Sequence, residues 1–429
     1  MMEKTFYPRL DEAVFRTVLP NGLPVCVLPR KGFTRKAAYL TVNYGSVHTA
    51  FSYAGRQYRV PDGVAHYLEH KMFDLEGRDV SEEFAAVGAN SNAFTSYDMT
   101  AYYFTCTDHF ETCLRLLLEM VCTPYFTRET VDKERGIIAQ EILMYADSAD
   151  SRVFELLTEN LYAHHPVRVP IAGSVESIQD ITPELLYTCH KAFYCPANMM
   201  LCVIGDVDPD AVEQIAREVL PPERAEVGVP DLGEAETMLP VRAKTVTEMD
   251  VAMPTFQLGF KCDGSRTGED YAHWEVVGEL AAEALFGESS PLYLRLYEQG
   301  LIDSSFGGGV ETVDGAAMLT CGGDSWEPEA VRDAILEEAR RLMQTGVSEE
   351  AFLRSKRSFF GRRVKDLDSF ESTCFRMCAY AMEDYDYFRF PETFDAVRAE
   401  EIAEFLRETV HADRASMSIV EPRQGKDAS

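Results

Sequence analysis

The pentapeptide His66-Tyr67-Leu68-Glu69-His70 contains the residue types of a catalytic metal site. Residues four apart on a helix lie one above the other, so a helix here would project both imidazoles from one face, about 6 Å apart. That spacing suits two ligands of one metal ion. Glu69 leans to the same side, where its carboxylate could reach a metal-bound water. The pentapeptide alone also fits two ordinary histidines on a helix surface.

A second acidic pair strengthens the metal interpretation. Glu134 and Glu141 are seven residues apart in one predicted helix, and seven residues make nearly two turns, so both carboxylates share a stripe. One could complete a site of two histidines and one glutamate, while the other orients a ligand histidine from behind. Such a site leaves the fourth tetrahedral position open to water, as a catalytic zinc requires. A solvated helix face near Lys133 and Arg135 is the alternative.

The surrounding sequence predicts the elements that must position these residues. GVAHYLEHKMF is an apolar-periodic helix entered through Pro61-Asp62-Gly63, with Asp62 as its predicted cap. TRETVDKERGIIAQEILMYADS predicts the long helix with both glutamates. SNAFTSY and MTAYYFTCT predict paired strands, and Asn21-Gly22 between two apolar runs predicts a hairpin.

The chain is long enough for two domains. Its 429 residues exceed one ordinary core, and a stretch rich in Pro, Gly and Glu divides it. We expect an N-terminal domain over residues 1–222, a linker over 223–245 and a C-terminal domain over 246–429. Both halves run strand, helices, strands, helices, strand, which predicts an internal duplication.

Composition excludes several classes of function. Hydrophobic residues make up 46% and charged residues 26%, as in an ordered globular protein. The net charge of -30 disfavours nucleic acid or an anionic membrane as partner. The eleven cysteines are scattered in apolar runs, so we expect reduced, buried thiols, including Cys374 and Cys378 one helical turn apart. No bilayer-spanning run and no secretory signal is evident, which predicts a cytoplasmic protein.

Several segments together resemble the pitrilysin/insulinase family of zinc metallopeptidases. HxxEH is that family's inverted zinc motif, and PDGVAHYLEHKMF, GANSNAFTSYDMTAYYF and ERGIIAQEILMYADS match family segments. The chain is most similar to small bacterial members, which correspond to half of an insulysin and are similar to mitochondrial processing peptidase subunits. This resemblance implies an α+β fold of two homologous α/β-sandwich domains, each a mainly antiparallel sheet covered by helices. It also implies that the second domain is non-catalytic and contributes to a substrate chamber.

The resemblance assigns roles to the site residues. His66, His70 and Glu141 are the implied ligands of one Zn²⁺ per chain, because the family's ligand is the Glu seven after the Glu of the Glu-Arg pair. Glu134 takes the place of the family's glutamate that orients a ligand histidine from behind. Glu69 is the implied general base, taking a proton from the zinc-bound water and passing it to the leaving amine.

The resemblance also implies how substrate binds. A peptide is expected to add as a strand to the edge formed by Ser91, Asn92, Ala93, Phe94 and Thr95. Backbone pairing of this kind reads extended peptides and tolerates many side chains. An ordinary sheet strand is the alternative interpretation of the same residues.

The second half departs from the family pattern. Members complete on their own carry an Arg and, seven residues later, a Tyr, both contacting substrate. Here Arg295 is present, but Ile302 stands where the tyrosine is expected. Either this chain works with a weakened second site, or a homologous partner subunit supplies the Arg/Tyr pair. We favour the partner, as a homo- or heterodimer, although Arg295 also suits a structural salt bridge.

These features predict a zinc endopeptidase that acts on peptides or unfolded segments in a closed chamber. Two alternatives remain open. One is a noncatalytic scaffold subunit of a larger complex; such family members characteristically lose the zinc motif, whereas His66, Glu69, His70 and Glu141 are all present here. The other is a dedicated maturation protease for one peptide precursor.

Overall fold

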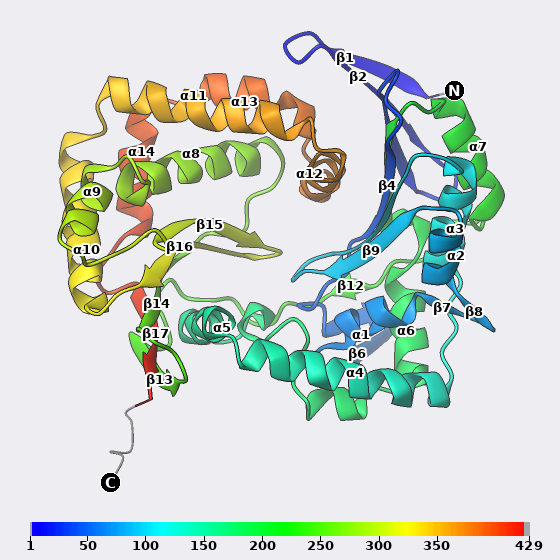
Figure 1. Ribbon diagram of the computed structural model, residues 1–429, viewed down its shortest axis with the longest axis horizontal. Helices are drawn as coiled ribbons and strands as arrows, with labels where there is room; N and C mark the ends of the chain where they lie inside the picture. Colours follow the sequence, from blue (N-terminus) through cyan, green and yellow to red (C-terminus); the bar gives the residue numbers. More distant parts are fainter. Residues whose placement is uncertain (1, 424–429) are drawn as a thin grey trace. The chain divides into compact units, whose positions relative to one another are not determined.

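The computed structural model of the chain describes residues 2–423. They form two units, each discontinuous in sequence (Figure 1). Unit 1 contains the residues up to Ile142, together with Pro170–Asp231 and Arg362–Arg389. Unit 2 contains Leu143–Val169, Leu232–Gly361 and the described residues from Phe390 onward. Each unit therefore combines segments from both halves of the sequence.

Unit 1 is built on a seven-stranded sheet of order β1-β2-β3-β11-β4-β10-β9. β3 and β11 pair in parallel, and the other neighbours are antiparallel. The strands are β1 (Glu3–Tyr7), β2 (Glu12–Val18), β3 (Pro24–Pro29), β4 (Lys36–Val42), β9 (Asn90–Thr95), β10 (Thr100–Cys106) and β11 (Met199–Gly205).

Two of these pairings were predicted from the sequence. Gly22, at φ 95°, turns the chain between β2 and β3, with its N–H donating to the Leu19 carbonyl at 2.9 Å. The predicted pair SNAFTSY and MTAYYFTCT forms the antiparallel hairpin of β9 and β10, in which Thr95 lies opposite Thr100. Both hairpins confirm the strand predictions for this half.

Helices cover both faces of the unit 1 sheet. α3 (Phe110–Cys122) contacts β10 and β4, and α7 (Pro209–Val219) contacts β3 and α3. α12 (Phe370–Met382), from late in the sequence, packs on β11 and β4 from the other side (Figure 1). The remaining elements are α1 (Val64–Lys71), α2 (Val80–Ala86), α4 (Arg128–Ala146, which begins in this unit), α6 (Pro183–Phe193), the short strands β5 (Ala50–Tyr53), β6 (Arg56–Arg59), β7 (Asp74–Leu75), β8 (Arg78–Asp79) and β12 (Val229–Pro230), and the 3₁₀ turns Ser177–Asp180, Pro196–Asn198 and Tyr387–Arg389.

Unit 2 is built on a five-stranded sheet of order β13-β17-β14-β16-β15. α5 (Ala149–Leu161), from the first half of the sequence, packs on β17 and β14, while α8 contacts β15 and β16. The other elements of the unit are β13 (Lys244–Met249), β14 (Thr255–Cys262), β15 (Gly307–Val313), β16 (Ala316–Asp324), β17 (Ala415–Pro422), α8 (Gly268–Phe286), α9 (Pro291–Glu298), α10 (Pro328–Thr345), α11 (Glu349–Asp366, which begins in this unit), α13 (Phe390–Ala396), α14 (Ala399–Thr409) and a 3₁₀ turn at Pro166–Arg168.

The two sheets repeat one topology. In unit 1, β11 is parallel to β3 and antiparallel to β4, which is followed by β10 and β9. In unit 2, β17 is parallel to β13 and antiparallel to β14, which is followed by β16 and β15. This repeat supports the predicted duplication, and the mixed fold of mainly antiparallel, helix-covered sheets confirms the predicted α+β class.

The cysteines match the sequence-based prediction. All eleven are free, and ten of them are buried, including Cys374 and Cys378 on α12. Cys202 of β11 meets the Met377 sulfur of α12 at 3.7 Å, so the thiols there pack as apolar groups. Within the described residues, we also find no helix with the length and hydropathy that a membrane span requires.

Residues of the segment predicted as linker make specific contacts in unit 2. Glu236 accepts hydrogen bonds from the backbone N–H groups of His164 at 2.6 Å and His165 at 2.9 Å, and its other oxygen pairs with the Lys261 ammonium at 3.0 Å. Burial alone would raise the pKa of the Glu236 carboxyl, but these donors and the Ala163 N–H lower it to about 2. Lys261 is 2% exposed, so Glu236 is the counter-charge of a buried cation.

We predict that Glu236→Gln lowers the free energy of unfolding by about 2 kcal/mol at pH 7, because the buried Lys261 ammonium loses its counter-charge. The loss is no larger because Glu236 is partly exposed, and solvent screens the ion pair. Since the folded pKa lies below the usual 4.5, this stabilisation is present above pH 4.5 and is lost as the pH falls toward 2. Urea unfolding of wild type and variant across this pH range measures the difference.

The matched control is Glu234→Gln, because that side chain is 85% exposed. We expect it to change stability by less than about 0.5 kcal/mol at any pH. Equal effects of the two substitutions would contradict the assigned role of Glu236.

Candidate metal centre

Helix α1 (Val64–Lys71) begins at a glycine held against a neighbouring segment. Its N-cap is Gly63, which has φ 87° and no side-chain cap. A Cβ at this position would lie 2.3 Å from the carbonyl oxygen of Ala172, so only glycine fits. The prediction of Asp62 as cap is wrong. The close tertiary approach of Ala172, rather than a side-chain oxygen, fixes where α1 starts.

The segment around Ala172 also contacts helix α4. The Ser177 hydroxyl donates to the Asp62 carbonyl at 2.9 Å, just before α1. Farther along, the guanidinium of Arg135 on α4 donates to the carbonyls of Ile178 at 3.2 Å and Ile181 at 2.9 Å. One segment thus braces both helices that carry the candidate site.

Helix α4 (Arg128–Ala146) begins with two threonines that cap each other. The Thr130 N–H donates to the Thr127 hydroxyl at 3.2 Å, and the Thr127 N–H donates to the Thr130 hydroxyl at 3.3 Å. This reciprocal arrangement satisfies two donors that the first turn would otherwise leave unpaired.

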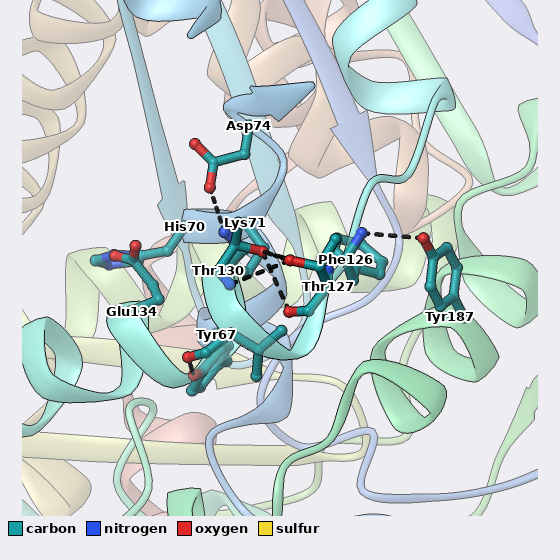
Figure 2. A network of polar contacts seen from close by, with 10 residues as sticks. Tyr67, His70, Lys71, Asp74, Phe126, Thr127, Thr130, Glu134 and Tyr187 are labelled. Atoms are coloured by element: carbon teal, nitrogen blue, oxygen red, sulfur yellow. Dashed lines mark hydrogen bonds and ion pairs between the residues drawn. The ribbon is translucent and has the colours of Figure 1, made fainter. Parts of the chain in front are cut away.

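Two side chains of α1 then dock onto α4 (Figure 2). The hydroxyl of Tyr67, which is fully buried, donates to the carbonyl of Val131. One turn later, Nδ1 of His70 meets Oε1 of Glu134 at 3.0 Å. These contacts fix how far along α4 the helix α1 lies.

The predicted ligands converge at this junction. Nε2 of His66 lies 3.6 Å from Oε1 of Glu141, and Nε2 of His70 lies 3.3 Å from Oε2 of Glu141. One donor atom from each of the three residues lies within 4.8 Å of the others. The structure therefore brings together all three residues that were predicted as metal ligands.

These separations fit a tetrahedral ion. Two donors each about 2.0 to 2.1 Å from one zinc ion, at the tetrahedral angle, are roughly 3.4 Å apart. The observed separations, from His66 to one Glu141 oxygen and from His70 to the other, lie on either side of this value. Two imidazoles and a carboxylate are also ligand types that zinc accepts. The residues present therefore fit the implied zinc.

Glu134 orients His70 from behind. A hydrogen bond from Nδ1–H to the Glu134 carboxylate leaves the Nε2 lone pair directed at the donor cluster. This bond lowers the pKa of the Glu134 carboxyl, assisted by the buried Lys71. Burial acts to lower the pKa of His70. The carboxylates of Glu134, Glu69 and Glu141 outweigh this effect and raise the pKa.

The two histidines differ in their support. Nδ1 of His66 is buried and has no hydrogen-bond partner among the described residues. Unlike His70, His66 therefore has no charged acceptor at its Nδ1 atom in the described part of the chain.

Glu69 stands beside the three donors without joining their group. It is 8% exposed, and its Oε2 accepts a hydrogen bond from the Thr95 hydroxyl at 2.8 Å. Burial raises the pKa of Glu69, although the imidazoles and the Thr95 hydrogen bond partly offset this. A buried carboxylate with a raised pKa beside a candidate metal site suits proton transfer.

The residues predicted to bind substrate lie on an edge strand. Ser91, Asn92, Ala93 and Phe94 belong to β9, which pairs with β10 alone among the strands of the described sheet. The Asn92 side chain accepts a hydrogen bond from the Ala93 N–H at 2.9 Å. The Phe94 ring packs against Phe375 of α12, with centroids 5.8 Å apart.

The predicted Arg295 lies in unit 2, exposed on α9. Ile302, which replaces the tyrosine of the family pattern, is 4% exposed and belongs to the interior of that unit. The described structure thus places an apolar side chain, packed inward, where the family pattern has a phenol.

Sequence reasoning missed the residues that position the site. Tyr67 lies inside the pentapeptide, but the target of its hydroxyl depends on the packing of α1 against α4. Thr95 was included in the expected edge without its contact to Glu69. The signal available in the sequence was strand alternation, which places the side chain of Thr95 on the same face of the sheet as that of Ala93.

Comparison with known proteins identifies the family. Residues 37–175 match the family model described as Insulinase (Peptidase family M16), and residues 180–359 match that described as Peptidase M16 inactive domain. An uncharacterized zinc protease of Bacillus subtilis, YmfH, is 36% identical over 430 residues, covering 99% of this chain and 100% of the relative.

Two solved structures are also similar to this chain. An M16-like peptidase of Alicyclobacillus acidocaldarius matches with a TM-score of 0.91 and 31% identity over 98% of both chains. Pitrilysin matches with a TM-score of 0.79 and 15% identity, covering 100% of this chain and 47% of pitrilysin, which shows a shared fold. From the full-length match to YmfH and the two family models, we conclude that the chain belongs to the insulinase family of peptidases, M16.

Proposed function

We propose that this chain is a zinc-dependent endopeptidase that cleaves peptides or unfolded segments, with Glu69 as its general base. The observation that carries the proposal is the convergence of His66, His70 and Glu141 donor atoms beside the buried Glu69 carboxylate. The similarity to a relative named as a zinc protease supports the same activity.

The proposed mechanism assigns each step to a residue. Zinc, when bound by the three donors, would lower the pKa of a water molecule toward 7 and polarise the scissile carbonyl. Glu69 accepts the proton of the attacking water and transfers it to the leaving amine. Glu134 keeps His70 in the tautomer whose Nε2 can bind a cation.

In this proposal, substrate pairs as an extra strand with β9 along Ser91 to Phe94. The edge position of β9 supports this, because main-chain groups on its outer side face no other described strand of the sheet. The Asn92 contact with the Ala93 N–H is exposed, so an incoming strand can replace it. From the family resemblance, we also propose a closed chamber that rejects folded proteins by size.

We further propose that a homologous subunit without its own zinc completes the enzyme. The inward packing of Ile302 supports this, since the chain offers no tyrosine at the position of the family's Arg/Tyr pair. In this arrangement, residues 1–222 of this chain form the catalytic domain, and residues 246–429 of the same chain form the homologous non-catalytic domain.

Substitution of the proposed base tests the mechanism. We predict that Glu69→Gln keeps its zinc and lowers kcat by about 10³-fold, because the amide cannot accept the proton. The measurement is cleavage of a fluorogenic unstructured peptide, by the purified chain alone and with any zinc-less homologue, together with zinc content by mass spectrometry. Glu82→Gln, an exposed change on α2, is the matched control. Cleavage by Glu69→Gln at the wild-type rate would refute the role of Glu69.

Substitution around His70 tests the metal site independently of activity. We predict that His70→Ala loses stoichiometric zinc and that Glu134→Gln weakens zinc binding by about 10- to 100-fold, because His70 loses its charged acceptor. Competition with a chromophoric chelator measures both affinities. The matched control is Glu129→Gln, because Glu129 is exposed on the first turn of α4, the helix that carries Glu134. This variant should bind zinc like wild type. Undiminished zinc in His70→Ala would mean that the ion binds elsewhere.

A further inference from the structure

One hydrogen bond joins the strand proposed to bind substrate to the proposed base. Thr95 is the last residue of β9, and its Oγ1–H donates to Oε2 of Glu69 at 2.8 Å. Glu69 is 8% exposed, so water competes weakly for that oxygen. The contact spans two elements, since Glu69 lies on α1.

The hydroxyl donor is rigidly held. The backbone of Thr95 is paired with Thr100 in the β9–β10 hairpin, and the branched Thr side chain has few accessible χ1 rotamers. The sheet therefore fixes the position of the hydroxyl, and the hydroxyl in turn fixes one carboxylate oxygen. Glu69 itself has a long, flexible side chain, whose orientation α1 alone does not determine.

The orientation of Glu69 matters because the carboxylate is next to the metal donors. Without restraint, it could turn toward His66, His70 and Glu141 and become a fourth protein ligand. A site with four protein ligands is closed, as in structural zinc sites, and has no position for water. Holding Oε2 on Thr95 leaves Oε1 available to accept a proton.

We propose that Thr95 is a positioning residue that holds Glu69 in its base orientation and out of the metal coordination sphere. This inference rests on the proposed endopeptidase function. It also makes base alignment depend on β9, the strand that would pair with the peptide, so substrate pairing and base orientation share one rigid element.

The test compares Thr95→Val, which keeps the shape of the side chain and removes the donor, with Thr95→Ser, which restores a hydroxyl. We expect Thr95→Val to lower kcat by about 10- to 100-fold on the same fluorogenic peptide, with KM changed less than about 2-fold. Zinc content should remain one per chain. Thr95→Ser should recover most of the lost kcat.

A spectroscopic measurement reports the coordination directly. With cobalt(II) in place of zinc, the visible absorption bands of resting Thr95→Val should differ from those of wild type, because Glu69 enters the coordination sphere. The double variant Thr95→Val with Glu69→Gln should lose that difference. These spectra are recorded without substrate, so they do not depend on turnover.

Thr100→Val is the matched control. Thr100 lies opposite Thr95 on β10, is fully buried, and its hydroxyl donates to the Tyr44 carbonyl, also at 2.8 Å. We expect this variant to lose stability but to keep the wild-type kcat and cobalt spectrum. If Thr95→Val does not fold, as judged by circular dichroism, Thr95→Ala takes its place in every arm.

Two results would overturn the inference. One is wild-type kcat and an unchanged cobalt spectrum in Thr95→Val while Glu69→Gln is inactive, which would leave the proposed function intact. The other is an equal loss of kcat in Thr95→Val and Thr100→Val, which would indicate a merely structural hydroxyl. Full activity of Glu69→Gln would instead refute the proposed function itself.

Discussion

The register of α1 on α4 determines the geometry of the candidate metal centre. Two contacts set it, from the Tyr67 hydroxyl to the Val131 carbonyl and from His70 to Glu134, and both join residues 64 apart in sequence. With these contacts formed, Glu141 reaches both imidazoles from two turns farther along α4. A slip of one residue would move Glu141 about 1.5 Å along the helix and rotate it by about 100°. The segment that braces Asp62 and Arg135 opposes such a slip.

Spacing predicted the candidate donors because it is a property of single helices, while the choice of Glu141 over Glu134 as the ligand came from the family resemblance. The HxxEH spacing and the seven-residue interval of Glu134 and Glu141 each fix one helix face, whatever surrounds it. The hairpin of β9 and β10 was equally predictable from alternation. The start of α1 was not, because Gly63 is required by the backbone of Ala172, 109 positions away in the chain. The contact from Thr95 to Glu69 likewise depends on the docking of α1 beside the sheet.

Among the described residues, the candidate metal centre occurs in one of the two repeated sheets' units, unit 1. In unit 2, α8 and α9 occupy the interval between β14 and β15, as α1 and α2 occupy that between β4 and β9. α8 has a single histidine, His273, whose Nε2 pairs with Glu401 at 2.8 Å. Both units therefore have the same order of strands, while among the described residues a helix with two histidines four positions apart lies between the corresponding strands in unit 1 alone. This difference agrees with the match of residues 180–359 to the family model described as an inactive domain.

The exchange of helices between sequence halves constrains when unit 1 can finish folding. Its sheet is covered on one face by α12, whose Phe370, Cys374, Met377 and Cys378 are buried. The ribosome makes these residues long after β4 and β11, so a nascent chain holding only the first half exposes an apolar sheet face. Until residues 370–382 have been translated, that face is open to chaperones or to aggregation. The half of the gene that encodes the metal ligands thus does not encode a self-sufficient folding unit.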